Sequence, residues 1–380
     1  MKRVHTVVLC IFLGAGVADA IPRFAVKNGV SCSTCHVSPT GGGLRNDYGV
    51  TVVSMDELPL QKGMRFTDED YTGMVGDHLR LGADFRLQVL STAGRNAARK
   101  VAFFPMQGAI YAHLRVSRVV EGYGKVDLVR RSPEFWTLLN VLPNGSYVVM
   151  GRKIPTYGLR LDDHTSFIRG GNLSLRHTRA DGEAFAKEGM PFSPRVPLPA
   201  IFEIGLKFSD FFATVSLSNP YVLGSETGFQ VFQDLSQKNV TARLEYSTSL
   251  ASLSGLVGGS VMREQNVTLA GIFGGVSLGR VAWLGEVDRA RNWSGEGVAS
   301  LASYSEVIVE PVQGLNLLLK FDLFDEDTDL KANTLTRTTL GVEMFPLSFW
   351  EVKVQARFTD VSGVSGQPAP EYLIQFHTWF

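Results

Sequence analysis

Hydrophobic and polar residues alternate with a period of two along much of the chain. Between residues 79 and 89 one alternating set is apolar and the other mostly polar, the apolar set being Leu79, Leu81, Ala83, Phe85, Leu87 and Val89 and the polar members Arg80, Asp84, Arg86 and Gln88. Successive side chains of a β-strand point to opposite faces, which gives this period. The pattern predicts a strand with one apolar and one polar face.

The same alternation returns in residues 315–323, with Leu318 as an exception, and in residues 350–359. Many alternating segments are about ten residues long, the length of a tilted strand that crosses a membrane. No segment after residue 20 has 18 consecutive apolar residues, so a helical membrane protein is not predicted. The pattern predicts an antiparallel β-barrel.

The links between these segments alternate in length in the second half of the chain. Short links fall at Ser209-Asp210, Leu278-Gly279, Pro311–Gly314 and Pro346–Ser348, and longer polar links near 219–238, 290–299, 325–333 and 361–369. Short turns at one end and long loops at the other are typical of an outer-membrane barrel. A secreted β-sandwich, the alternative fold, also has alternating strands but does not require this asymmetry.

The end of the chain carries a further barrel signal. The last strand has one aromatic-rich face, formed by Tyr372, Ile374, Phe376 and Phe380 together with Thr378. This ending resembles the terminal strand that the barrel-assembly machinery recognises in bacterial outer-membrane proteins. Counting strands back from Phe380 gives about 16, the first starting near His78, with both chain ends in the periplasm. Residues 120–153 are ambiguous, so 14 and 18 strands are the alternatives.

Residues 154–198 do not alternate like a barrel wall. They are rich in proline, glycine and charged residues, and include His164 and His177. A connection of this length is usually functional, and in a barrel it can fold into the lumen and narrow it. The alternative is a disordered outer loop.

The first 20 residues have the anatomy of an export signal. Lys2 and Arg3 precede an apolar stretch from Val7 to Val17, and Ala18-Asp19-Ala20 forms a small-x-small cleavage site. The sequence therefore predicts export by the Sec route and a bacterial outer-membrane location. An N-terminal membrane anchor is disfavoured because the apolar stretch is about half of the ~20 residues that a spanning helix needs.

Charge and cysteine content narrow the classes of function. Removing residues 1–20 takes two of the 37 basic and one of the 37 acidic residues, so the net charge stays close to zero and does not indicate a nucleic-acid partner. It also takes Cys10, which leaves only Cys32 and Cys35. Both remaining thiols belong to one motif, so a disulfide framework is excluded.

Cys32-Ser33-Thr34-Cys35-His36 matches C-x-x-C-H. Two thiols at this spacing can form thioethers to the vinyl groups of a haem, and the adjacent histidine can bind the iron as its proximal ligand. A thioredoxin-like redox pair would need a surrounding βαβ unit, and a zinc site would need a second Cys-x-x-Cys. The motif therefore predicts one covalently bound haem c, with its iron bound by His36.

The predicted organisation is a signal peptide (residues 1–20), a monohaem c-type cytochrome segment (residues 21–77) and an outer-membrane barrel (residues 78–380). The cytochrome segment is too short to surround a porphyrin, so we expect the haem to use the barrel's lumen or mouth. Candidates for the sixth iron ligand are His78, His113 and His377, which we expect on the polar face near the periplasmic end, and Met55, Met64 and Met74. His164 and His177 are further candidates if the long connection folds inward.

The export signal, a single C-x-x-C-H within the first forty residues and a long barrel with an aromatic last residue together resemble the fused monohaem cytochrome-porins of iron-oxidising bacteria. The resemblance implies haem-binding roles for Cys32, Cys35 and His36, and an electron-transfer function at the outer membrane. The segment Val37–Gly49 departs from the one associated with the iron oxidases, so the general class is better supported than iron oxidation.

Three functions are therefore considered. The first is electron transfer across or at the outer membrane, with a periplasmic c-type cytochrome or another electron carrier as partner and membrane lipid around the barrel. The second is a porin-like solute channel in which the haem is a plug or a sensor. The third is a haem oxidoreductase such as a ferrous iron oxidase. An electron carrier is favoured over a substrate-converting enzyme, because no catalytic arrangement of acid, base or nucleophile stands out.

Overall fold

The structure is a computed structural model that describes residues 22–60, 71–92, 99–129, 132–159, 165–171, 177–192, 198–222, 237–250, 252–365 and 368–380. Its strands are β1 (Met74–Val75), β2 (Leu79–Thr92), β3 (Lys100–Arg115), β4 (Val120–Asp127), β5 (Ser132–Leu139), β6 (Tyr147–Arg152), β7 (Ala200–Phe208), β8 (Phe211–Ser218), β9 (Asn239–Leu250), β10 (Leu253–Glu264), β11 (Val267–Leu278), β12 (Val281–Arg291), β13 (Ala299–Val312), β14 (Leu315–Asp325), β15 (Thr334–Met344), β16 (Trp350–Val361) and β17 (Glu371–Trp379). The signal segment and Met64 and His164 lie outside the described residues.

In the described ranges five short helices accompany these strands: α1 (Pro22–Asn28), the 3₁₀ turn η1 (Cys32–Thr34), the π-helix η2 (Gly49–Glu57), and the 3₁₀ turns η3 (Pro143–Gly145) and η4 (Phe167–Arg169). No helix in the described ranges combines the length and apolarity needed to cross a membrane.

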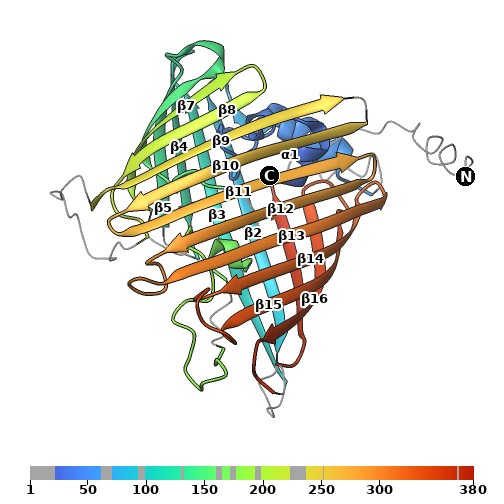
Figure 1. Cartoon of the computed structure of the whole chain (residues 1–380). Helices are drawn as coiled ribbons and strands as arrows, with labels where there is room; N and C mark the ends of the chain where they lie inside the picture. Colours follow the sequence, from blue (N-terminus) through green and yellow to red (C-terminus); the bar gives the residue numbers. More distant parts are fainter. Residues whose placement is uncertain are drawn as a thin grey trace, which may run out of the picture.

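Strands β2 to β17 form a closed antiparallel barrel of 16 strands in the described part of the chain (Figure 1). Each strand pairs with the next along the chain, and β17 pairs with β2 to close the ring, with Ile374 opposite Val89. The two-residue strand β1 pairs only with the start of β2. The predicted all-β barrel of about 16 strands is confirmed.

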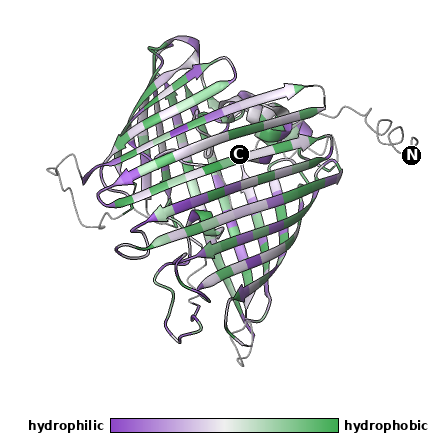
Figure 2. Ribbon diagram, in the orientation of Figure 1, coloured by the Kyte–Doolittle hydropathy of each residue, from purple (hydrophilic) through white to green (hydrophobic). Residues whose placement is uncertain are grey.

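The strand pattern places apolar side chains outside and polar side chains inside. In β2, Leu81, Phe85 and Leu87 are exposed, whereas Arg80 and Arg86 are buried. Hydropathy alternates along most strands in the same way (Figure 2). An outer face of this kind suits lipid, and the polar inner face suits a lumen.

The two ends of the barrel differ in the length of their links. At the tight-turn end, where β2 begins and β17 ends, two-residue links such as Ser209-Asp210 reverse the chain, and Ser209 has a φ of 52°. Most links at the opposite, long-loop end are longer. The exception is Gln265-Asn266 between β10 and β11, where one residue with a φ of 52° suffices for a tight reversal.

The interior of the barrel is filled by the chain itself. Residues 22–60, here called the plug, lie within the ring of strands near the tight-turn end (Figure 1). The described parts of residues 153–192, here called the lumen segment, pack against the inner wall, and Phe167 and Ile168 are completely buried there. A side chain on the inner wall is therefore covered by protein in most places.

Candidate functional site

The plug packs its apolar residues against the ends of several strands at the tight-turn end. Helix α1 contacts β10, β11 and β12. Further along the plug, buried residues form one cluster with the barrel, consisting of Phe24, Cys35, Val50, Val53, Met55, Leu58, Phe345, Phe349 and Trp379. The backbone N–H of Leu60 donates a hydrogen bond to the carbonyl of Phe345, at 2.8 Å. The plug thus extends across the mouth from β10–β12, where α1 lies, to β17.

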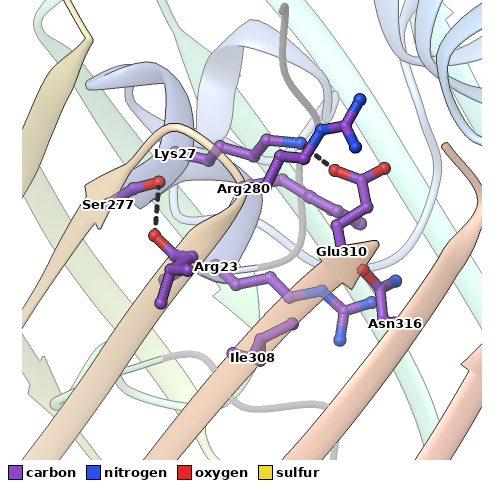
Figure 3. Close-up of a pocket in the computed structure, with 10 residues that line it drawn as sticks. Arg23, Lys27, Ser277, Arg280, Ile308, Glu310 and Asn316 are labelled. Carbon is purple, nitrogen blue, oxygen red and sulfur yellow. Dashed lines mark hydrogen bonds and ion pairs between the residues drawn. The ribbon is translucent and has the colours of Figure 1, made fainter. Parts of the chain in front are cut away.

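Two cations of α1 fasten the plug to one wall. Arg23 forms an ion pair with Glu343 of β15, and Lys27 forms one with Glu310 of β13. Figure 3 shows both side chains reaching from the helix towards these strands, with Asn316 beside them. Asn316 donates a hydrogen bond to Glu343 over 3.0 Å, and Ser254 donates one to the carbonyl of Lys27 over 2.6 Å.

Arg23 is buried, and its charge is maintained by its neighbours. Burial on its own would lower the pKa of the Arg23 guanidinium, but the charges of Glu343 and Glu306 raise that pKa above its ordinary value. A buried ion pair is weak evidence of stability, but removing one partner leaves an uncompensated buried charge. The pair therefore makes withdrawal of α1 from the wall costly.

A second set of contacts fastens the plug to β17 and β2, which lie across the ring from β10 to β12. Asp47 forms an ion pair with Arg80 of β2, and the Arg45 guanidinium lies 4.6 Å from the centre of the Trp379 ring. Ser54 accepts a hydrogen bond from the indole of Trp379. With α1 on β10 to β12 and these residues on β17 and β2, the plug is held at both sides of the lumen.

The C-x-x-C-H motif lies inside this plug, on a single turn of helix. The backbone N–H groups of Cys35 and His36 both donate to the Cys32 carbonyl, at 3.3 and 3.1 Å. Residues three apart on a 3₁₀ turn eclipse one another, so the two thiols lie on the same side. Cys32 is half-buried and Cys35 is buried, and no disulfide joins them in the described chain.

Asn46 holds this turn in shape. Its side-chain amide donates hydrogen bonds to the carbonyls of Ser33 and Thr34, each at 3.0 Å, and its backbone N–H donates to the Cys35 carbonyl at 3.0 Å. Gly49 in turn donates to the Asn46 side chain, and a Cβ on Gly49 would overlap the Cys35 carbonyl oxygen. Sequence reasoning missed Asn46, although an asparagine shortly after a turn motif is a residue type that bonds backbone groups locally.

The residues of the turn fit a covalently attached haem. Two thiols and an imidazole are presented by one short, hydrogen-bonded turn, which is the donor set that the motif predicts. Gly41 has a φ of 83°, and a Cβ there would lie 2.9 Å from Cys32 Cβ and 3.1 Å from its Sγ. The absence of a side chain at Gly41 therefore leaves room beside the Cys32 thiol.

The candidate histidine ligands differ in burial and in their position relative to the inner wall. His113 and His377 are buried on the inner wall, on the face where we expected them. His78 differs from the expectation: it lies in the turn before β2, is exposed, and its Nδ1 is 2.9 Å from the Arg115 carbonyl. The strand begins one residue later than predicted, which puts His78 outside its alternation.

Both inner-wall histidines are bound to carboxylates. His377 lies between Glu351, 2.7 Å from Nδ1, and Asp84, 3.0 Å from Nε2. His113 Nε2 lies 2.9 Å from Glu121. Either ring would have to leave a carboxylate before Nε2 could bind iron.

Met55, Met74 and His177, the other described ligand candidates, lie in three different surroundings. Met55 is buried in the same apolar cluster as Cys35, whereas Met74 is exposed in β1. His177 belongs to the lumen segment, where its Nδ1 lies 3.2 Å from Glu188. Among the described candidates, Met55 is the one that shares a cluster with the motif.

The lumen segment occupies the barrel beyond the plug and is held by polar contacts. Arg169 pairs with Glu286 at 2.7 Å, Lys153 pairs with Glu203 at 2.8 Å, and Ser166 donates to Asp322 at 2.6 Å. Glu203 and Asp322 have no solvent-exposed surface. These three wall carboxylates therefore bind the chain's own segment.

No family model and no curated protein sequence matches the chain. Solved structures with a similar fold include OprB of Pseudomonas putida (TM-score 0.58, 11% identity, covering 80% of this chain and 94% of that one) and the outer-membrane channel DcaP of Acinetobacter baumannii (0.55, 10%, 80% and 97%). An anion-selective porin from Comamonas acidovorans is similar as well (0.51, 11%, 80% and 99%).

These likenesses concern the barrel, and the porin part of the predicted resemblance is thereby supported. The cytochrome part stays a prediction that rests on the motif. The chain has a 16-stranded barrel of the outer-membrane porin type.

Proposed function

We propose that this chain is a porin-like channel protein of the bacterial outer membrane whose passage is closed by its own plug and lumen segment. The observation that carries the proposal is a plug fastened across the mouth of a porin-type barrel, with α1 packed on β10 to β12 on one side and Asp47 paired with Arg80 of β2 on the other. The similarity to proteins described as a channel and as an anion-selective porin supports it.

The contacts that hold the plug are separable from those that hold the barrel. The barrel depends on hydrogen-bonded pairing between neighbouring strands, whereas α1 depends on two ion pairs, the hydrogen bond from Ser254 and the packing of Phe24 and Val26. Displacing α1 leaves the ladder intact and exposes Glu310 and Glu343 to the lumen. The wall then presents polar side chains to water and to hydrated solutes.

Conductance across planar lipid bilayers tests this proposal. The double variant Glu310→Gln with Glu343→Gln removes both partners of the α1 cations, and we expect it to open several-fold more often than the natural protein. Glu296→Gln, at an exposed loop position, is the matched control. Deletion of residues 22–60 should give the largest conductance, and an unchanged, closed barrel after this deletion would falsify the role of the plug.

A second function, electron transfer, is favoured by one specific observation, the motif turn clamped by Asn46 in the barrel's mouth. Cys32 and Cys35 would attach a haem c, His36 would bind its iron, and Met55 is the described candidate for a second iron ligand. The haem, when bound, supplies a one-electron ferric/ferrous couple. The barrel residues exclude lipid from the site, and the tight-turn face is where a periplasmic cytochrome or another carrier would meet it.

One set of measurements separates the two functions. The protein is exported in cells that carry out cytochrome maturation, and covalent haem is read from its absorbance after denaturation. Liposomes that enclose an electron acceptor are then assayed for acceptor reduction by an external donor. Haem with transfer supports the relay. Haem without transfer, combined with plug-dependent conductance, supports a channel in which the haem is part of the plug, and absence of haem removes the relay.

A haem oxidoreductase such as an iron oxidase requires a displaceable sixth ligand. Binding of carbon monoxide without denaturant would support that third hypothesis.

A further inference from the structure

Three arginines project from the outer face of the barrel at its long-loop end. They are Arg263 near the end of β10 and Arg289 and Arg291 at the end of β12, and all three are exposed. Strand β11 lies between these two strands (Figure 1), so that Thr268 is opposite Arg263 on one side and opposite Arg291 on the other. These four residues form one surface, here called the arginine patch.

The alternation of the strands separates these cations from the neighbouring acidic residues. Glu264 and Asp288 adjoin Arg263 and Arg289 in sequence, but both have no exposed surface and belong to the inner wall. In the described part of the chain, no acidic side chain forms an ion pair with an arginine of the patch. The exposed acidic residue nearest in sequence is Glu296, in the link after β12. The patch therefore has a surplus of positive charge.

The patch lies at the boundary of the apolar outer surface. The next outward residue of β12 below Arg289 is Val287, which is 43% exposed, and its partner on β11 is Ile272, which is 69% exposed. An arginine on the lipid face is costly at the middle of a bilayer but tolerated near its surface. Because the long loops of such barrels face the cell exterior, the patch lies at the depth of the lipid headgroups of the outer leaflet.

Other parts of the rim at this end carry the opposite charge. The outward positions of β14 and β16 follow the same alternation, with Phe321 and Phe358 exposed in the middle of these strands. At the long-loop end, the corresponding outward residues are Asp325 and Asp360. The arginines are therefore gathered on β10 and β12, and acidic residues replace them on β14 and β16.

We propose that the arginine patch binds the phosphate group of a phosphorylated lipid of the outer leaflet. From strand geometry, the Cα atoms of Arg289 and Arg291 are about 7 Å apart, and those of Arg263 and Arg291 about 10 Å. Long side chains at this spacing reach one headgroup. A guanidinium binds phosphate oxygens through paired hydrogen bonds, and the Thr268 hydroxyl supplies a further donor.

The position of the patch favours a lipid over a free phosphate ion. The phosphate of a lipid lies against the arginines while its acyl chains lie along Val287 and Ile272, so both parts of the surface are covered by one molecule. A free ion makes only the first of these contacts. The proposal concerns the outer wall and does not depend on what the plug does inside the barrel.

Lipid retained by the purified protein tests the proposal. The full chain is reconstituted in phosphatidylcholine nanodiscs that contain a small fraction of a glycolipid with two phosphate groups. It is then transferred to a neutral detergent, and bound glycolipid is counted by native mass spectrometry. The natural protein should retain the glycolipid. The patch variant should retain several-fold less, and combines Arg263→Gln, Arg289→Gln and Arg291→Gln.

The matched control removes the same charge from dispersed exposed positions. It combines Lys100→Gln, Arg118→Gln and Lys331→Gln, and should retain as much glycolipid as the natural protein. Folding of each variant is checked by its altered gel mobility after heating. If the patch variant does not fold, Arg291→Gln alone is compared with Lys100→Gln alone. Equal retention by the patch variant and its control overturns the proposal.

Two further arms identify the group that is bound. The same glycolipid without its phosphates should be retained several-fold less by the natural protein, and equal retention would overturn the role of the phosphate. An excess of inorganic phosphate should leave the glycolipid bound. Release by inorganic phosphate would indicate a site for the free ion and overturn the assignment to a lipid.

Discussion

The indole nitrogen of Trp379 donates a hydrogen bond to the hydroxyl of Ser54, over a distance of 2.9 Å. Trp379 is the next-to-last residue of the chain and belongs to β17, whereas Ser54 belongs to η2 of the plug. Both side chains are buried. The bond joins the strand that closes the barrel to the segment that closes its mouth.

Replacing Ser54 by alanine removes the acceptor and leaves a buried indole N–H without it. An unsatisfied buried donor costs about 1–3 kcal/mol, and we expect this cost to fall on docking of the plug, because no strand pairing changes. Limited proteolysis should cleave the plug about tenfold faster, a factor that corresponds to about 1.4 kcal/mol. Thr51→Ala is the control, since that hydroxyl bonds the Asp47 carbonyl on the exposed side of the plug. Equal cleavage of the two variants contradicts the prediction.

Gly49→Ala should loosen the motif turn. The added Cβ overlaps the Cys35 carbonyl oxygen, which belongs to the backbone and has to move. We expect the buried Cys35 thiol of haem-free protein to react with an alkylating reagent several-fold faster. The control is Gly124→Ala, because its new Cβ meets no atom within 4 Å. An unchanged rate for Gly49→Ala would show that the turn does not depend on this close contact.

Replacing Met55 and replacing His377 should affect haem-loaded protein differently. Met55→Ala should change the absorbance of the oxidised form and allow carbon monoxide to bind without denaturant, because Met55 packs in the cluster that contains Cys35. His377→Ala should leave both spectra unchanged, since its ring is bound to Glu351 and Asp84. The reverse result assigns the sixth position to His377.

Arg169→Met should release the lumen segment. It leaves Glu286 and Asp288 as buried carboxylates without their cation, and breaking a buried pair in this way costs about 3–5 kcal/mol. Hydrogen exchange measured by mass spectrometry should speed up in residues 165–171. Arg179→Met serves as the comparison, because Arg179 is itself partly exposed and its shorter ion pair, 3.0 Å to the exposed Asp181, contributes little; its second partner, Glu326, lies 3.4 Å away. Protection that survives in Arg169→Met would show that apolar packing alone holds the segment.

The period of two was sufficient to predict the barrel and its strand number. Each membrane strand carries its own alternation, as in β2 and β14, so the signal is local and can be counted. Residues 120–153 were ambiguous for a physical reason that the structure reveals. Strands β4 to β6 are short, and β4 carries Gly122 and Gly124 on its outer face, which weakens the apolar half of the pattern.

The candidate site was predictable only in part. The motif residues Cys32, Cys35 and His36 follow from spacing within five positions, and a local motif can be read without the fold. The contacts that position the motif are not local: Arg23 meets Glu343, and Ser54 meets Trp379, across some three hundred residues. The sequence offers no periodic signal for such pairs. The attachment of the plug to the barrel can therefore be seen only in the folded structure.

The attachment of the plug to β15 and β17 also imposes an order on assembly. The plug lies at the beginning of the chain, yet Glu343, Phe349 and Trp379, which receive it, lie near the other terminus. The first-made residues therefore cannot complete their docking until the last-made strands have joined the ring. Complete docking must follow closure of the ring, and a polypeptide truncated before β15 would lack these three anchoring residues for its leading segment.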